Sequence, residues 1–146
     1  MNQAINDFVS GKRIAIVGAS RSGKKFGNSV ATELKVRGYQ VFLVHPEVKE
    51  IGGERTYPNL AALAGQVDGV WVCVSPNKVA QTLRDAAAAG LQRVWLQMGA
   101  NSPEAQTVAR EVGLSPISGK CILMYAQPVG SIHAWHRAFA RITGTL

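Results

Sequence analysis

Short apolar segments rich in β-branched residues alternate along the chain with longer segments whose apolar residues recur at helical spacing. Strands that are buried on both faces read as continuous hydrophobic runs, so these segments are typical of a parallel sheet. We predict strands at residues 13–18, 40–45, 69–74 and 93–98. Trp71 and Trp95 hold matching central places in the last two segments, and we expect both in the core or against a helix.

The helical segments carry start and stop signals at their ends. Ser75 and Ser102 each stand before a proline, which is the arrangement of an N-cap followed by the first helical residue. Gly38 and Gly113 stand where a left-handed residue can close a helix. A weaker pattern at residues 51–63 indicates a short extended piece followed by a short alanine-rich helix.

This alternation predicts βαβ units with right-handed crossovers and ligands bound beyond the carboxyl ends of the strands. The expected fold is α/β, a Rossmann-like doubly wound parallel sheet of about five strands in a three-layer αβα arrangement. The length of 146 residues is that of one domain, so we predict a single domain over 1–146 with its core at 11–125. Apolar residues at helical spacing predict an extra C-terminal helix at about 131–142, packed on the domain or on a second copy in a homo-oligomer.

Charge points to an anionic partner. The formal net charge is +7, and in the segment from Gly11 to Gly38 the single acidic residue is Glu33 among many lysines and arginines. Aromatic residues are few and mostly spaced as core, so a small anionic molecule is favoured over nucleic acid. The chain shows no signal-peptide pattern and no apolar stretch long enough for a bilayer, so we expect no membrane partner and a cytoplasmic location.

Candidate chemistry concentrates in the turn after the first strand, IVGASRSGKKFGNS at residues 16–29. Glycines let the backbone approach a phosphate, and the next helix offers free N–H groups and the positive end of its dipole. Gly18, Gly23 and Lys24 fit the loop of nucleoside triphosphatases, but Lys25 replaces the hydroxyl residue that binds magnesium. The aspartate that would help hold magnesium is also missing after the third strand, so phosphate hydrolysis is disfavoured.

A dinucleotide site fits only in part. The G-x-G-x-x-G spacing is broken, because Ala19 and Ser20 directly follow Gly18. The second strand ends at His45 instead of the carboxylate that binds the ribose diol of NAD, and Glu47 lies beyond a proline. A nucleotide with a phosphorylated ribose suits this end better, which leaves NADP or coenzyme A.

Several short motifs, in this order and at these intervals, resemble the stand-alone CoA-binding domain proteins, which are similar to the amino-terminal domain of the succinyl-CoA synthetase α subunit. They are VGAS at 17–20, KFG at 25–27, HP at 45–46, YPNLAAL at 57–63, VSP at 74–76, WLQMG at 95–99 and the cysteine of KCI at 121. This chain departs from the family at His45, where asparagine is more usual, and around Lys120 and Cys121, where aspartate and arginine usually precede the cysteine.

The resemblance implies coenzyme A as the cofactor and assigns residues to its site. The phosphates would meet Gly18, Ala19 and Ser20, with the covering helix begun by Phe26, Gly27 and Asn28. Lys49, with Lys24 or Lys25, would bind the 3′-phosphate. The other contacts would come from His45, Pro46, Val74, Ser75, Pro76, Gln97, Gly99 and Cys121. For three of these residues a structural role alone is a sufficient explanation: Ser75 suits a helix cap, Pro46 suits a turn and Gly99 suits a loop.

The thiols and histidines suggest little further chemistry. Cys121 should lie past the last strand, where a mixed disulfide with the coenzyme is conceivable, but a small buried hydrophobe is favoured, as it is for Cys73. We expect no structural disulfide. His133 and His136 lack a third ligand of suitable spacing, so no metal site is predicted.

Three function classes remain. The first is a non-catalytic protein that binds CoA or an acyl-CoA thioester in a regulatory or carrier role, since no G-x-S-x-G elbow or other catalytic constellation is present. The alternative is an NADP-dependent oxidoreductase or NAD(P)-binding sensor. A basic nucleic-acid binder is the least favoured.

Overall fold

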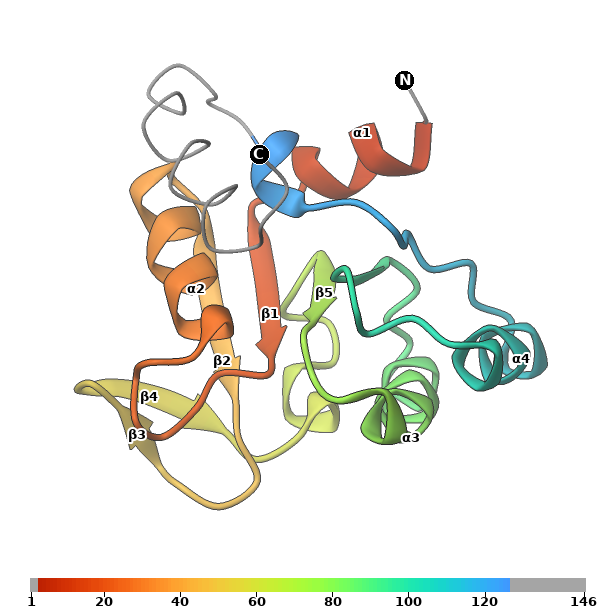
Figure 1. Cartoon of the computed structure of the whole chain (residues 1–146). Coiled ribbons are helices and arrows are strands. Elements are labelled where there is room, and N and C mark those ends of the chain that lie inside the picture. Colours follow the sequence, from red (N-terminus) through yellow and green to blue (C-terminus); the bar gives the residue numbers. More distant parts are fainter. Residues whose placement is uncertain (1–2, 127–146) are drawn as a thin grey trace.

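The structure is a computed structural model that describes residues 3–126, and it contains one six-stranded sheet with helices on both faces (Figure 1). The strand order is β3-β4-β2-β1-β5-β6. Each neighbouring pair is parallel except β3 and β4, which are antiparallel. The predicted Rossmann-like α/β fold is therefore confirmed, with a short antiparallel strand added at one edge.

The four predicted strands are present and differ from the predicted bounds by at most two residues at either end. The observed strands are β1 Arg13–Val17, β2 Gln40–Val44, β3 Glu50–Ile51, β4 Glu54–Tyr57, β5 Gly69–Val72 and β6 Val94–Leu96. The pair β3 and β4 forms the extended piece expected near residue 51. Trp71 and Trp95 are fully buried, as predicted.

The helices are α1 Gln3–Ser10, α2 Phe26–Val36, α3 Pro76–Ala88 and α4 Pro103–Val112, with short 3-10 helices η1 Leu60–Leu63 and η2 Ile122–Met124. Ser102 caps α4, since its hydroxyl accepts the N–H of Ala105 at 3.0 Å. Gly113 ends that helix with φ 79°, in the left-handed region. Ser75 also holds the N-cap position of α3, but its hydroxyl donates to the side chain of Asn77 and caps no backbone group.

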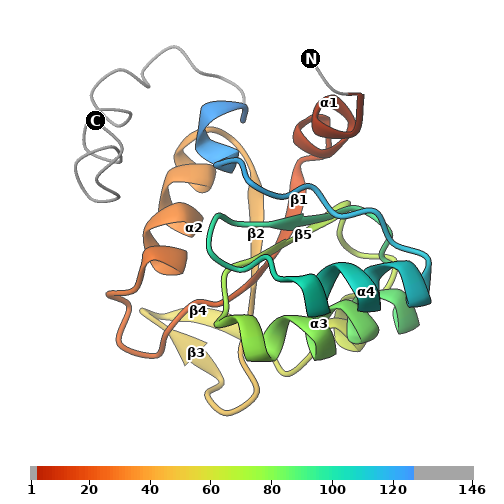
Figure 2. The same cartoon turned by 45° about the vertical axis from the view of Figure 1, so that its right-hand side comes forward.

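The sheet separates two apolar layers (Figure 2). One layer contains buried residues of α1, α2 and η2, with Phe8 packed edge-on against Trp95 at 5.3 Å between ring centroids. The other contains buried residues of α3, α4 and η1, including Leu63 and Leu83. The predicted three-layer arrangement therefore places α2 and α3 on opposite faces of the sheet.

Two predictions concern residues outside the described range. The C-terminal helix at 131–142 and the pair His133 and His136 fall there, and the single domain over 1–146 also stays a prediction. Over residues 3–126, none of the helices has both the length and the apolar character needed to cross a membrane.

Candidate functional site

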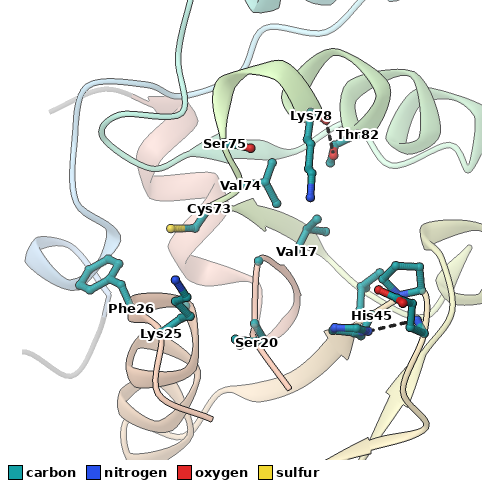
Figure 3. A pocket seen from close by; sticks show the side chains of 16 residues that line it. Val17, Ser20, Lys25, Phe26, His45, Cys73, Val74, Ser75, Lys78 and Thr82 are labelled. Carbon is teal, nitrogen blue, oxygen red and sulfur yellow. Dashed lines mark hydrogen bonds between the residues drawn. The ribbon is translucent and has the colours of Figure 1, made fainter. Parts of the chain in front are cut away.

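A cavity of 590 Å³ opens beyond the carboxyl ends of β1, β2 and β5 (Figure 3). This lies within the usual range for small-molecule sites. Because β1 has β2 on one side and β5 on the other, the cavity sits where the strand order reverses, which is where open α/β sheets bind ligands. Its lining residues are Val17, Gly18, Ala19, Ser20, Lys25, Phe26, Gly27, Val44, His45, Pro46, Glu47, Cys73, Val74, Ser75, Lys78 and Thr82.

At two glycines of the cavity floor, backbone segments pack too closely to leave room for a side chain. A Cβ at Gly18 would lie 2.2 Å from the Cys73 carbonyl oxygen, and Gly18 has φ +131°. A Cβ at Gly27 would lie 2.6 Å from the Gly18 carbonyl oxygen. The loop after β1 therefore packs directly against the end of β5 and the first turn of α2.

Asn28 fixes the shape of this loop without lining the cavity. Its Oδ1 accepts the N–H groups of Ser20 at 2.9 Å and Lys25 at 3.2 Å, and its Nδ2 donates to the Ser20 carbonyl oxygen at 3.1 Å. Ser20 Oγ in turn accepts the N–H of Ser22 at 3.2 Å. Asn28 is thus a positioning residue for the loop, which brings Ser20 and Lys25 to the cavity.

Lysine side chains enter the cavity from two layers of the protein. Lys25 comes from the start of α2 and Lys78 from the first turn of α3, and Figure 3 shows both ammonium groups directed into the space between. Neither lysine forms an ion pair with any residue of the described part of the chain. The cavity therefore presents uncompensated positive charge on opposite walls.

Sequence reasoning missed Lys78 and Thr82. Thr82 lies one helical turn after Lys78, and its hydroxyl donates to the Lys78 carbonyl oxygen at 3.0 Å. A signal was available, because these residues follow Ser75 at spacings that keep all three on one helix face. Which face turns to the cavity, however, depends on how α3 packs on the sheet.

The end of β2 supplies a third wall. His45 Nδ1 accepts the N–H of Glu47 at 3.1 Å and the N–H of Val48 at 3.2 Å. The Glu47 side chain also lines the cavity, and its carboxylate lies 3.3 Å from Arg21 Nη2 on the loop after β1. The carboxylate that the sequence placed beyond a proline therefore reaches the site, already paired with a cation.

The two thiols differ in position. Cys73 follows the last residue of β5 and lines the cavity half-buried, so the expectation that it lies inside a core strand was wrong. Cys121 is 4% exposed and behaves as the small buried hydrophobe that was favoured. Burial raises the pKa of both thiols, and Cys121 raises that of Cys73 further. Both are free cysteines held as thiols.

The profile of the CoA binding domain family matches residues 12–127. The chain belongs to the CoA-binding domain family. Its expected resemblance to this family is confirmed, and the match spans every motif on which the resemblance was based.

Relatives of this CoA-binding domain include parts of larger proteins and small proteins. The chain is 32% identical over 88 residues to the α subunit of ADP-forming acetate–CoA ligase II of Pyrococcus furiosus, covering 60% of this chain and 19% of that subunit. It is 26% identical over 111 residues to YneT of Bacillus subtilis, covering 76% of this chain and 82% of that protein. A solved structure of a conserved hypothetical protein of Pyrococcus furiosus superposes with a TM-score of 0.71 at 33% identity, covering 76% of this chain and 96% of the other.

Some residues assigned through the CoA-binding family do not line the cavity, namely Lys24, Asn28, Lys49, Pro76, Gln97, Gly99 and Cys121. Gln97 is 3% exposed and its Oε1 accepts the indole N–H of Trp71 at 3.2 Å, so it satisfies a buried donor. Pro76 is the first residue of α3, as its sequence position indicated. Within residues 3–126, no three His, Cys, Asp or Glu side chains gather where they could hold a metal ion.

Proposed function

We propose that this protein binds coenzyme A or an acyl-CoA thioester in the cavity at the carboxyl ends of β1, β2 and β5. The observation that carries the proposal is the pair of cations, Lys25 and Lys78, that face one another across a glycine-floored cavity with no anionic partner in the described chain. A diphosphate between them would compensate both charges. Membership of the CoA-binding domain family supports the choice of this ligand over other polyanions.

The phosphates belong at the glycine loop. Phe26 begins α2, so the first N–H groups and the positive end of this eleven-residue helix are directed toward the cavity floor. Val17, Val44 and Val74 add apolar wall, which suits the adenine ring or the pantetheine arm beside a few fixed polar groups. The cavity therefore combines an anion site with apolar surface, as a CoA ligand requires.

We propose that the role is binding without catalysis, in a carrier or regulatory function. The Cys73 thiol, whose pKa is raised by burial, is a poor nucleophile, because nucleophilic attack requires the thiolate. The Nδ1 atom of His45 accepts two backbone N–H groups, so its lone pair is not available to take a proton from a ligand. This chain spans 19% of the ligase subunit and 82% of YneT, so the matching segment occurs both within a larger protein and as most of a small one. This distribution supports the choice of a binding module.

NADP is the second candidate, for an oxidoreductase or a nucleotide sensor. The same loop and cations would accept its diphosphate, and Glu47 could accept a ribose hydroxyl once Arg21 turns to a phosphate. This reading is supported by the Rossmann-like fold, in which dinucleotides bind at the same edge of the sheet.

A thermal-shift panel of CoA, acetyl-CoA, dephospho-CoA, NADP and NAD tests the proposal. A ligand at about 100 times its dissociation constant stabilises the native state by about 2.7 kcal/mol, which raises the melting temperature by several degrees. We expect the largest shift with CoA or acetyl-CoA and a smaller one with dephospho-CoA. Stabilisation by NADP but not by CoA would replace the first candidate with the second.

A further inference from the structure

We propose that His45 determines specificity for a phosphorylated ribose, by donating its Nε2–H to the phosphoryl group that distinguishes CoA from dephospho-CoA. This inference rests on the proposed function and names the residue that reads one part of the ligand. It also moves the contact for the 3′-phosphate away from Lys24 and Lys49, which do not line the cavity.

The backbone selects the tautomer of His45. Two N–H groups, those of Glu47 and Val48, donate to Nδ1 at 3.1 and 3.2 Å, so Nδ1 must hold a lone pair. A neutral imidazole with an acceptor at Nδ1 carries its proton on Nε2. In Figure 3 the imidazole ring of His45 lies between Ser20 and the backbone that donates to Nδ1. The edge of the ring away from Nδ1 is turned to the cavity. His45 therefore presents a fixed donor to a ligand.

A donor at this position selects for an acceptor on the ligand. In NAD sites of doubly wound sheets, a carboxylate at the end of the second strand accepts hydrogen bonds from the ribose hydroxyls. Here that place holds the Nε2–H of His45, which suits a phosphate oxygen, an acceptor without a proton to donate. The nearby Glu47 carboxylate forms an exposed pair with Arg21 at 3.3 Å, which partly offsets its charge at this edge of the sheet.

Two substitutions separate this role from a purely structural one. Aspartate in His45→Asp can still accept the N–H groups of residues 47 and 48, but it replaces the donor with a carboxylate. Glutamine in His45→Gln places an amide N–H near the position of Nε2, but it loses the acceptor at Nδ1. The first variant keeps the turn, removes the donor and adds a carboxylate that repels a phosphate, whereas the second keeps the donor without the turn.

The readout is the ratio of the dissociation constants for dephospho-CoA and CoA, measured by calorimetry. Because CoA makes one more charge-assisted contact than dephospho-CoA, wild-type protein should bind dephospho-CoA about tenfold or more weakly than CoA. We expect His45→Asp to bring the ratio close to one, and His45→Gln to keep most of it while lowering the melting temperature. Lys49→Gln, a charge removed from the same loop but outside the cavity, should leave the ratio unchanged.

These measurements distinguish a failure of the proposed function from a failure of the role proposed for His45. If wild-type protein binds neither CoA nor acetyl-CoA, the proposed function itself is overturned. If wild type prefers CoA and His45→Asp keeps that preference, CoA binding stands and the role of His45 is overturned. A ratio lost in Lys49→Gln but kept in His45→Asp would return the 3′-phosphate contact to the lysine.

Discussion

Lys24 and Lys25 are adjacent in the chain, yet only Lys25 lines the cavity. Lys25→Gln removes one of the cations proposed to hold the diphosphate, so CoA affinity should fall about tenfold or more, as for other charge-assisted contacts. Lys24→Gln makes the same change in net charge and should alter affinity by less than about twofold, because exposed charges outside a site are screened. Calorimetry with both variants measures the difference.

Lys78→Gln should resemble Lys25→Gln, although it lies on the opposite face of the sheet. Arg84→Gln is its matched control, since Arg84 belongs to the same helix and pairs with Glu111 at 3.6 Å outside the cavity. Equal losses of affinity in the site variants and their controls would mean that the overall charge, and not the cavity, attracts the ligand.

Two glycines of the loop after β1 differ in how much space they leave for a side chain. Gly18→Ala places a Cβ against the Cys73 carbonyl at a φ of +131°, and we expect it to destabilise the fold by about 3 kcal/mol or more. Gly23 has φ +73° and no atom within 4 Å of a built Cβ, so Gly23→Ala should cost only about 1–2 kcal/mol. Urea unfolding of both variants measures this, and equal costs would contradict the close packing of the loop on β5.

At the scale of elements, two serines with the same sequence signal differ in function. Ser102 accepts the N–H of Ala105, so Ser102→Ala should lower the free energy of unfolding by about 1 kcal/mol. Ser75 makes no such bond, and Ser75→Ala should cost less than about 0.5 kcal/mol. Chemical denaturation compares them. A larger loss at Ser75 would show that it caps α3 in solution.

The strands were predictable because burial on both faces leaves a continuous apolar run, as in Arg13–Val17. Helix α1 was not predicted, although Ile5, Phe8 and Val9 stand at helical spacing, because an isolated segment of eight residues is too short to be a stable helix. Its Ile5, Phe8 and Val9 become buried only against the core, where Phe8 meets Trp95. Its helical state therefore depends on tertiary contacts that a local pattern does not contain.

The site was predictable where it follows from strand ends and was not where it depends on helix packing. The glycine loop and His45 come directly after β1 and β2, so the carboxyl edge of the sheet brings them together. Lys78 and Thr82 reach the cavity through the orientation of α3. Gln97 was expected in the wall and instead turns to the Trp71 indole, because that buried N–H needs an acceptor.

At the scale of the whole molecule, the cavity lies where the strand order reverses, and residues from the helical layers on both faces of the sheet line it. The chain leaves β1 toward α2 on one face and leaves β5 toward α3 on the other, so Lys25 and Lys78 approach the same space from opposite sides. An anion held by both would connect the two layers through the site. Such a site exists only when both layers are folded on the sheet, so a ligand bound there binds the native state alone and should raise the melting temperature.

Acid stability tests another connection across the sheet. The Asp68 carboxylate precedes β5 and accepts three bonds from Arg13 at the start of β1, from its backbone N–H at 3.0 Å, Nε at 3.3 Å and Nη2 at 2.9 Å. The hydrogen bond from the Arg13 side chain is the main cause that lowers the pKa of Asp68 in the fold. A carboxyl whose pKa is lower when folded stabilises the native state above its unfolded pKa of about 4, and this contribution is lost as the pH falls through the folded value.

Asp68→Asn removes this pH-dependent contribution. Urea unfolding at pH 7, 5, 4 and 3 should therefore show wild type more stable than Asp68→Asn by a constant amount down to about pH 5, and by a shrinking amount below about pH 4. Glu111→Gln is the control, because Glu111 lies in an exposed pair with Arg84 and its loss should change stability little at any of these pH values. A difference between wild type and Asp68→Asn that stays the same at pH 3 would show that the ionised carboxylate does not contribute to the link between β1 and β5.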